Sequence, residues 1–151
     1  DTNDSALVAV TGVDGRLFRL LGSAAKALQM MQQSAMKDGI GPPLLLVESG
    51  YRSDEEQKVL YEDKVNEYMT KFGYSREKAQ EEADIWVAPP GCSAHRTGRA
   101  IDLNMSIEST SGNAEALKKT KEYEWLKNNA AKFGFCNYEV EPWHWEYNPI
   151  K

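Results

Sequence analysis

Two short segments of this sequence hold both of its histidines, and both segments carry groups that bind metal ions. His95 and Asp102 are seven residues apart in the first segment, and His144 lies in the second. Neutral imidazole is the commonest protein ligand for zinc, and a catalytic zinc site has three protein ligands and one position open to water. We therefore expect His95, Asp102 and His144 to bind one Zn²⁺.

The residues around Asp102 predict how its side chain is presented. Gly98 allows a turn after His95, and Ile101 and Leu103 alternate with Asp102 as in a strand with one buried face. We expect this strand to cover residues 99–105. The side chain of Asp102 should then point away from the core.

The segment around His144 also shows the two-residue period of a strand. Trp143, Trp145 and Tyr147 alternate with His144 and Glu146. One face of this strand should therefore be aromatic packing. The other should present an imidazole and a carboxylate.

Three motifs, in order along the chain, resemble those of a known family. They are Ser-Gly-Tyr-Arg-Ser at residues 49–53, Ser-x-His-x-x-Gly-x-Ala-x-Asp at residues 93–102, and Glu-x-x-His at residues 141–144 within Pro-Trp-His. The set resembles the zinc-dependent D-alanyl-D-alanine carboxypeptidases of the VanY type, peptidoglycan metallopeptidases that share their fold with the hedgehog signalling domain. The resemblance implies removal of the terminal D-alanine from the stem peptides of bacterial peptidoglycan.

The resemblance also implies a proton carrier. Glu141, three residues before the ligand histidine, would move a proton from the attacking water to the leaving amine. From spacing alone, Glu139 and Glu146 are candidates for the same task. Glu146 has a further possible role, because a carboxylate on the His144 face of a strand can orient an imidazole.

Substrate contacts are expected from the first two motifs. The fixed guanidinium fork of Arg52 suits a developing oxyanion or a substrate carboxylate, and in the family the matching arginine contacts substrate near the scissile bond. Gln57 and Ser93 match family positions that help to hold the peptide.

Several alternatives stay open at this point. The motifs do not separate a D,D-carboxypeptidase from an L,D-carboxypeptidase or a peptidoglycan endopeptidase, and a non-catalytic zinc-containing cell-wall binding module is a candidate from another class. Cys92 and Cys136 each precede a histidine. They could form a disulfide, remain buried free thiols, or join the histidines in a closed structural zinc site.

Length and charge narrow the classes of protein to which this chain can belong. The 151 residues predict a single domain over 1–151, which the resemblance implies is a zinc peptidase domain. The net charge of −5 without a basic cluster excludes a typical nucleic-acid binder. No apolar run reaches the roughly 20 residues of a membrane span. We expect a monomer, and the resemblance implies export to the periplasm or cell envelope.

Periodicity and breakers predict the elements that position these motifs. We expect helices over residues 15–38, 53–72, 75–87 and 114–132, and a buried strand over 44–47. Strands separated by helices, but too few for repeated βαβ units, favour an α+β domain. Its sheet should be small and mainly antiparallel, with helices flanking it, and the resemblance implies the same fold.

Overall fold

The computed structural model describes residues 6–149, and the chain forms two compact units. Of the described residues, 52–96 form a helical unit, and 6–51 and 97–149 form a sheet unit. The predicted α+β class, with a small antiparallel sheet and flanking helices, is confirmed. The assignment of residues 1–151 to one domain stays a prediction. Among the described residues, no helix is long and apolar enough to cross a membrane.

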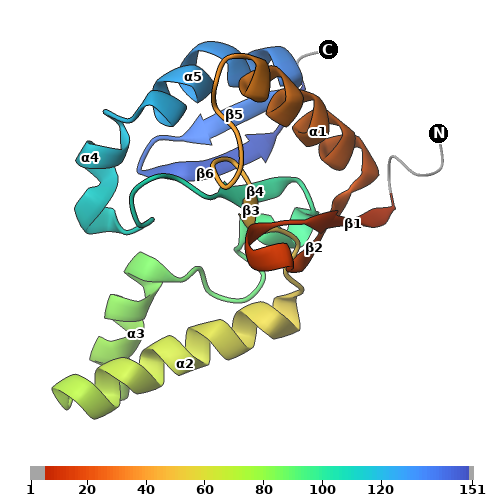
Figure 1. The fold of residues 1–151 in the computed structure, drawn as a ribbon. Helices are drawn as coiled ribbons and strands as arrows, with labels where there is room; N and C mark the ends of the chain where they lie inside the picture. Colours follow the sequence, from red (N-terminus) through yellow and green to blue (C-terminus); the bar gives the residue numbers. More distant parts are fainter. Residues whose placement is uncertain (1–5, 150–151) are drawn as a thin grey trace. The chain divides into compact units, whose positions relative to one another are not determined.

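The sheet unit is built on four antiparallel strands in the spatial order β3-β4-β6-β5 (Figure 1). The strands are β3 (Val47–Ser49), β4 (Ala100–Leu103), β5 (Phe135–Tyr138) and β6 (Glu141–Tyr147). The two central strands, β4 and β6, carry Asp102 and His144. Segments far apart in the sequence are therefore hydrogen-bonded neighbours.

Two helices, α1 (Gly22–Lys37) and α5 (Lys121–Asn129), cover one face of this sheet, and a short helix α4 (Ala114–Leu117) precedes α5 (Figure 1). Apolar residues at helical spacing on α1 and at alternate positions on the strands meet in one core. Its fully buried members include Leu28, Met31, Ile101, Leu103 and Leu126. The core lies on one side of β4 and β6, so the polar side chains between these apolar ones face the opposite side.

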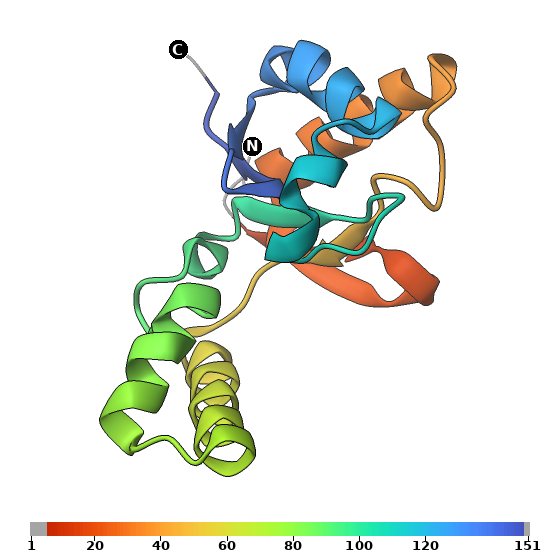
Figure 2. The same cartoon turned by 90° about the vertical axis from the view of Figure 1, so that its left-hand side faces the viewer.

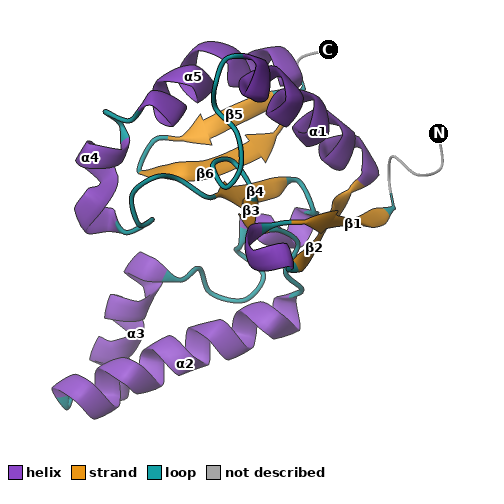
Figure 3. Ribbon diagram, viewed as in Figure 1, coloured by secondary structure: helices purple, strands orange, loops and turns teal. Residues whose placement is uncertain are grey.

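The predicted helix over residues 15–38 is wrong in its first part. Leu17–Leu21 form a strand, β2, that pairs with β1 (Leu7–Thr11) in an antiparallel hairpin, with Thr11 opposite Leu17 and Leu7 opposite Leu21 (Figure 3). The leucines that suggested a helical stripe belong to this hairpin, because pairing with the preceding strand overrides the local helical periodicity. The helix begins only at Gly22.

Two further boundaries differ from the prediction. The strand expected over 44–47 begins only at Val47, because residues 42–45 form turns and Leu45 has a φ of 65°. The helix expected over 114–132 is broken into α4 and α5 at Thr120, whose side chain accepts a hydrogen bond from Tyr123 N and begins α5 as an N-cap. The strand β5 was not predicted.

The helical unit is a pair of helices, α2 (Asp54–Phe72) and α3 (Arg76–Trp86), that pack side by side (Figures 1 and 2). Ser53 and Glu56 form a capping box at the start of α2, and Gly73 ends it with a φ of 66°. Both helices predicted for this unit are confirmed. They could be predicted because the capping residues act on the chain next to them. A small core of Tyr61, Val65, Ala79 and Ala83 joins them.

Candidate metal centre

Asp102 and His144 lie directly opposite each other in the paired strands β4 and β6. Oδ1 of Asp102 is 2.8 Å from Nδ1 of His144. Ile101 and Leu103, on either side of Asp102, have no exposed surface. The expectation that Asp102 points away from the core is therefore confirmed.

The other edge of the His144 ring faces Glu146. Oε2 of Glu146 is 3.1 Å from Nε2 of His144, and the imidazole is only 7% exposed. In the tautomer with its proton on Nε2, the ring donates that proton to Glu146. The lone pair of Nδ1 then lies on the edge that faces Asp102, as a metal ligand requires.

A third carboxylate lies near the same imidazole. Oε1 of Glu141, at the start of β6, is 4.0 Å from Nδ1 of His144. Burial lowers the pKa of His144, but the hydrogen bonds and charges of Asp102, Glu146 and Glu141 outweigh it and raise this pKa above its usual value. The arrangement concentrates negative charge around one ring and so favours a bound cation.

The helical unit brings together the other four predicted site residues. The backbone N–H of Arg52 donates to the carbonyl of His95 at 3.0 Å, and Oγ of Ser93 accepts from the backbone N–H of His95 at 3.2 Å. Nη1 of Arg52 donates to Oε1 of Gln57 at 2.7 Å, and Nε2 of Gln57 donates to the carbonyl of Ala88 at 2.7 Å. The motifs around residues 52 and 95 are therefore hydrogen-bonded to each other.

Gln57 has a more specific place than the sequence indicated. Its side chain is 2% exposed, and its amide oxygen and amide nitrogen bind Arg52 and Ala88. This geometry fixes one nitrogen of the Arg52 guanidinium. Direct contact of Gln57 or Ser93 with a substrate, and His95 as the third metal ligand, stay predictions.

Both cysteines are free and exposed in this structure. Of the three alternatives left open for Cys92 and Cys136, that of buried thiols is wrong, because both side chains are exposed. Within residues 6–149, neither cysteine belongs to a group that could hold a metal ion. The structure therefore gives no support to a closed Cys/His zinc site.

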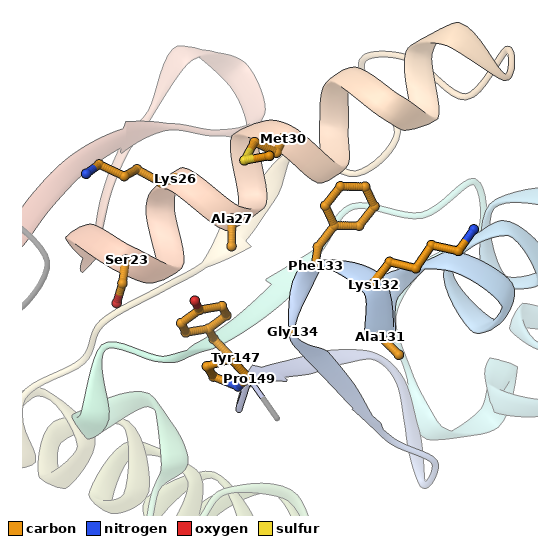
Figure 4. A pocket seen from close by; sticks show the side chains of 10 residues that line it. All are labelled: Ser23, Lys26, Ala27, Met30, Ala131, Lys132, Phe133, Gly134, Tyr147 and Pro149. Atoms are coloured by element: carbon orange, nitrogen blue, oxygen red, sulfur yellow. The ribbon is translucent and has the colours of Figure 1, made fainter. Parts of the chain in front are cut away.

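The sheet unit also has a hollow of about 480 Å³ between α1 and the turn that leads into β5 (Figure 4). Met30, Phe133 and Tyr147 line it, and Tyr147 also packs against the core. None of the predicted site residues is among its lining residues. This hollow is therefore separate from the Asp102–His144 pair.

Comparison with known proteins identifies the family of this fold and motif set. The family described as VanY, D-alanyl-D-alanine carboxypeptidase, matches residues 18–150. The chain belongs to the VanY family. A D-alanyl-D-alanine carboxypeptidase of Enterococcus faecalis is 37% identical over 135 residues, which cover 82% of this chain and 46% of the relative. One of Enterococcus faecium is 26% identical over 134 residues, with 82% and 35% covered. The chain thus spans less than half the length of these curated relatives.

Solved structures of the VanY type have the same fold. The vancomycin-resistance D,D-pentapeptidase VanY in complex with Zn(II) is 32% identical, with a TM-score of 0.67 over 95% of this chain and 79% of that one. VanYB in complex with D-alanine-D-alanine is 32% identical, with a TM-score of 0.69 over 96% and 79%. The LdcB LD-carboxypeptidase is 33% identical, with a TM-score of 0.69 over 88% and 61%.

Proposed function

We propose that this chain is a zinc-dependent carboxypeptidase that removes the terminal D-alanine from peptidoglycan stem peptides. The observation that carries the proposal is the Asp102–His144 pair, with Glu141 beside the same edge of the imidazole, on a VanY fold. The names of the relatives support the reaction, and the Zn(II) and D-alanine-D-alanine complexes of similar proteins support the metal and the substrate class.

The ligands of the metal would be His95, Asp102 and His144, a set of residue types that could hold a metal ion. The negative charge around His144 suits a cation. His95 lies three residues before Gly98, whose carbonyl accepts a hydrogen bond from Leu21 N at 2.9 Å. Consecutive Cα atoms are about 3.8 Å apart, so the Cα of His95 lies within roughly 11 Å of the Cα of Gly98, which this hydrogen bond holds beside Leu21. Bound zinc would lower the pKa of a water ligand to about 7 and polarise the scissile carbonyl.

The protein's own groups would handle the proton and the substrate. Glu141, whose side chain is 38% exposed, would accept a proton from the attacking water and deliver it to the leaving amine nitrogen. Arg52 would donate to the developing oxyanion or to the terminal carboxylate, with Gln57 holding its guanidinium in place. Ser93 would help to hold the peptide. A binding module without catalysis needs no proton carrier, which argues against that alternative.

L,D-carboxypeptidase action is the second candidate function. The similarity to LdcB favours L,D-carboxypeptidase action, in which the bond cut joins an L-residue to the terminal D-alanine. The two reactions share the metal and the proton carrier, so the difference must lie in how the peptide is held. For either reaction we infer that the protein is a monomer that acts on peptidoglycan in the cell envelope.

The decisive experiment is incubation of the zinc-loaded protein with stem pentapeptide, tetrapeptide and cross-linked muropeptides, followed by mass spectrometry of the products. Loss of one D-alanine from the pentapeptide supports the proposal. Loss of D-alanine from the tetrapeptide alone identifies the L,D-carboxypeptidase. Cleavage of the cross-link identifies an endopeptidase, and no cleavage of any of them by protein with one bound zinc contradicts the proposed enzyme.

A further inference from the structure

Glu48 occupies an irregularity in the sheet directly opposite a proposed metal ligand. In the pairing of β3 with β4, Val47 lies opposite Leu103 and Ser49 lies opposite Asp102, with a shift of register between the two pairs. Glu48 is therefore the extra residue of a bulge. A bulge places two residues opposite one, bends the strand and re-aims a side chain. Here it places the carboxylate of Glu48 near that of Asp102. Burial is the larger cause that raises the pKa of Glu48, and the negative charge of Asp102 is the second.

A hollow of about 410 Å³ opens beside this bulge within the sheet unit. Glu48, Asp14, Arg16 and Asn104 give it polar walls, and Val13, Pro43 and Leu46 complete the lining. Asn104 lies two residues after Asp102, so it continues the alternation that brings Asp102 out of the core. Asn104 therefore faces the same side of the sheet as Asp102, although Asp102 itself does not line the hollow.

The polar wall opposite β3 comes from the tip of the β1–β2 hairpin. A Cβ atom on Gly12 would collide with the carbonyl oxygen of Val47, so only glycine allows the hairpin to approach β3 this closely. The N–H of Gly12 donates to the carbonyl of Arg16 at 2.7 Å and closes the tip. The close approach of Gly12 to Val47 and the hydrogen bond that closes the tip together hold Asp14 and Arg16 beside Glu48.

The charges of the hollow are not balanced. Within residues 6–149 the half-buried carboxylate of Glu48 has no hydrogen bond and no ion pair, and Asp14 adds a second negative charge. The nearby cation, Arg16, has its guanidinium over the ring of Phe18, 5.2 Å from the centroid. A half-buried carboxylate without a partner is unfavourable, and an ammonium group brought by a ligand would relieve it.

We propose that Glu48 sets the side-chain preference of the enzyme by binding the ammonium group of a diamino-acid residue of the stem peptide in the hollow beside Asp102. The proposal rests on the proposed function, because it takes the peptide to be bound along this face. Glu48 supplies the charge-assisted hydrogen bond, and the apolar walls contact the methylene groups of the side chain. Glu48 does not touch the reacting atoms.

Two stem pentapeptides that differ in one group test this role. One has lysine at the third position and the other has Nε-acetyl-lysine, which keeps the length but removes the charge. We expect the wild-type protein to favour the free amine by about tenfold in kcat/KM, the size of one charge-assisted hydrogen bond. In Glu48→Gln this ratio should fall to about one, with kcat/KM for the acetylated peptide unchanged.

Control variants separate this role from a general effect of charge or folding. Glu115→Gln, at a side chain that is 86% exposed, should keep the wild-type ratio. Glu48→Asp keeps the charge on a shorter side chain, so it should keep part of the preference for the free amine. It replaces Glu48→Gln as the test variant if Glu48→Gln misfolds. Equal rates for the two peptides in the wild type, or an equal loss for both peptides in Glu48→Gln, would overturn the proposal.

The same peptides distinguish failure of this role from failure of the proposed function. If the wild-type protein cleaves neither peptide, the carboxypeptidase assignment fails. Binding of both peptides to the wild type and to Glu48→Gln, measured by isothermal titration calorimetry, then decides the role of Glu48. A wild-type preference for the free amine that disappears in Glu48→Gln supports it, and equal affinities or no binding contradict it.

Discussion

Oε2 of Glu146 lies 3.1 Å from Nε2 of His144, on the edge of the imidazole opposite the one that faces Asp102. Alternation along β6 puts both side chains on the same face of the strand. Glu141 instead lies near Nδ1, the edge shared with Asp102. The geometry therefore favours Glu146 as the group that orients the ring and Glu141 as the proton carrier.

Glu146→Ala should weaken zinc binding without unfolding the protein. Loss of the carboxylate that fixes a ligating imidazole costs about 10- to 100-fold in metal affinity, because the ring and its tautomer are no longer held. Competition with a chromophoric chelator measures the affinity. Glu139→Ala, at an exposed position close in sequence, is the matched control and should bind zinc as the wild type does. An unchanged affinity in Glu146→Ala would show that His144 is oriented by other contacts.

Glu141→Gln and His144→Ala should fail in different ways. The first removes a proton carrier without removing a ligand, so the protein should keep its zinc and lose on the order of 10² to 10⁴ in kcat. The second should lose zinc and activity together. Metal analysis of the purified variants, run beside the hydrolysis assay, separates the two. If Glu141→Gln turned over normally while Glu146→Gln did not, the roles of the two carboxylates would be exchanged.

The capping and strand signals near the motifs correctly predicted the helix that follows Arg52 and the strand faces that carry Asp102 and His144. Ser53, Glu56 and Gly73 act on the chain within one turn, so the bounds of α2 could be read from the sequence. The alternation around Asp102 and His144 likewise predicted their faces, because the core residues beside them are strongly apolar.

Features that depend on the pairing of one strand with another could not be predicted in this way. Leu17–Leu21 look helical until β1 is paired with them, and the bulge at Glu48 exists only through the register of β3 against β4. The strand predicted over 44–47 stopped before Glu48. Nothing in the sequence indicated that this side chain would lie near Asp102.

Arg52→Lys should be poorly tolerated although it keeps the positive charge. The guanidinium donates through Nη1 to Gln57 and has further N–H groups for a substrate oxygen, whereas an ammonium is a single point charge. Removing such a donor costs on the order of 10²-fold in kcat. Arg96→Lys is the matched control in the same unit, because its ion pair with Asp54 is about half exposed and so contributes little. Equal activity of the two variants at equal melting temperature would place Arg52 outside the site.

A C-terminally amidated pentapeptide should be a much poorer substrate than the free acid. A carboxypeptidase must bind the terminal carboxylate, and a charge-assisted pair with a guanidinium such as Arg52 is the means that the motifs provide. Comparing kcat/KM for the two peptides measures the preference, with the acid favoured by at least about tenfold. Equal rates would move the assignment from a carboxypeptidase to an endopeptidase.

Glu122, on α5, should stabilise the fold in a way that depends on pH. Its side chain is 2% exposed, and the backbone N–H of Ser106 donates to Oε2 at 2.5 Å. Burial raises the pKa of this carboxyl, but the hydrogen bonds from Ser106 and Thr120 outweigh it and leave the pKa below its usual value. The folded state therefore binds the proton less readily than the unfolded state, and the stabilisation is present above the unfolded-state pKa and is lost as pH falls through the folded-state pKa.

Glu122→Gln should accordingly lower the free energy of unfolding by about 1–3 kcal/mol at pH 7, because a buried charge-assisted hydrogen bond that ties the segment after β4 to α5 is lost. The difference from the wild type should shrink as the pH is lowered below the ordinary glutamate range. Urea unfolding of both proteins at several pH values measures it. Glu124→Gln, an exposed neighbour in the first turn of the same helix, should show little difference at any pH. A difference for Glu122→Gln that does not change with pH would mean that the ionised form of Glu122 is not the one that stabilises the fold.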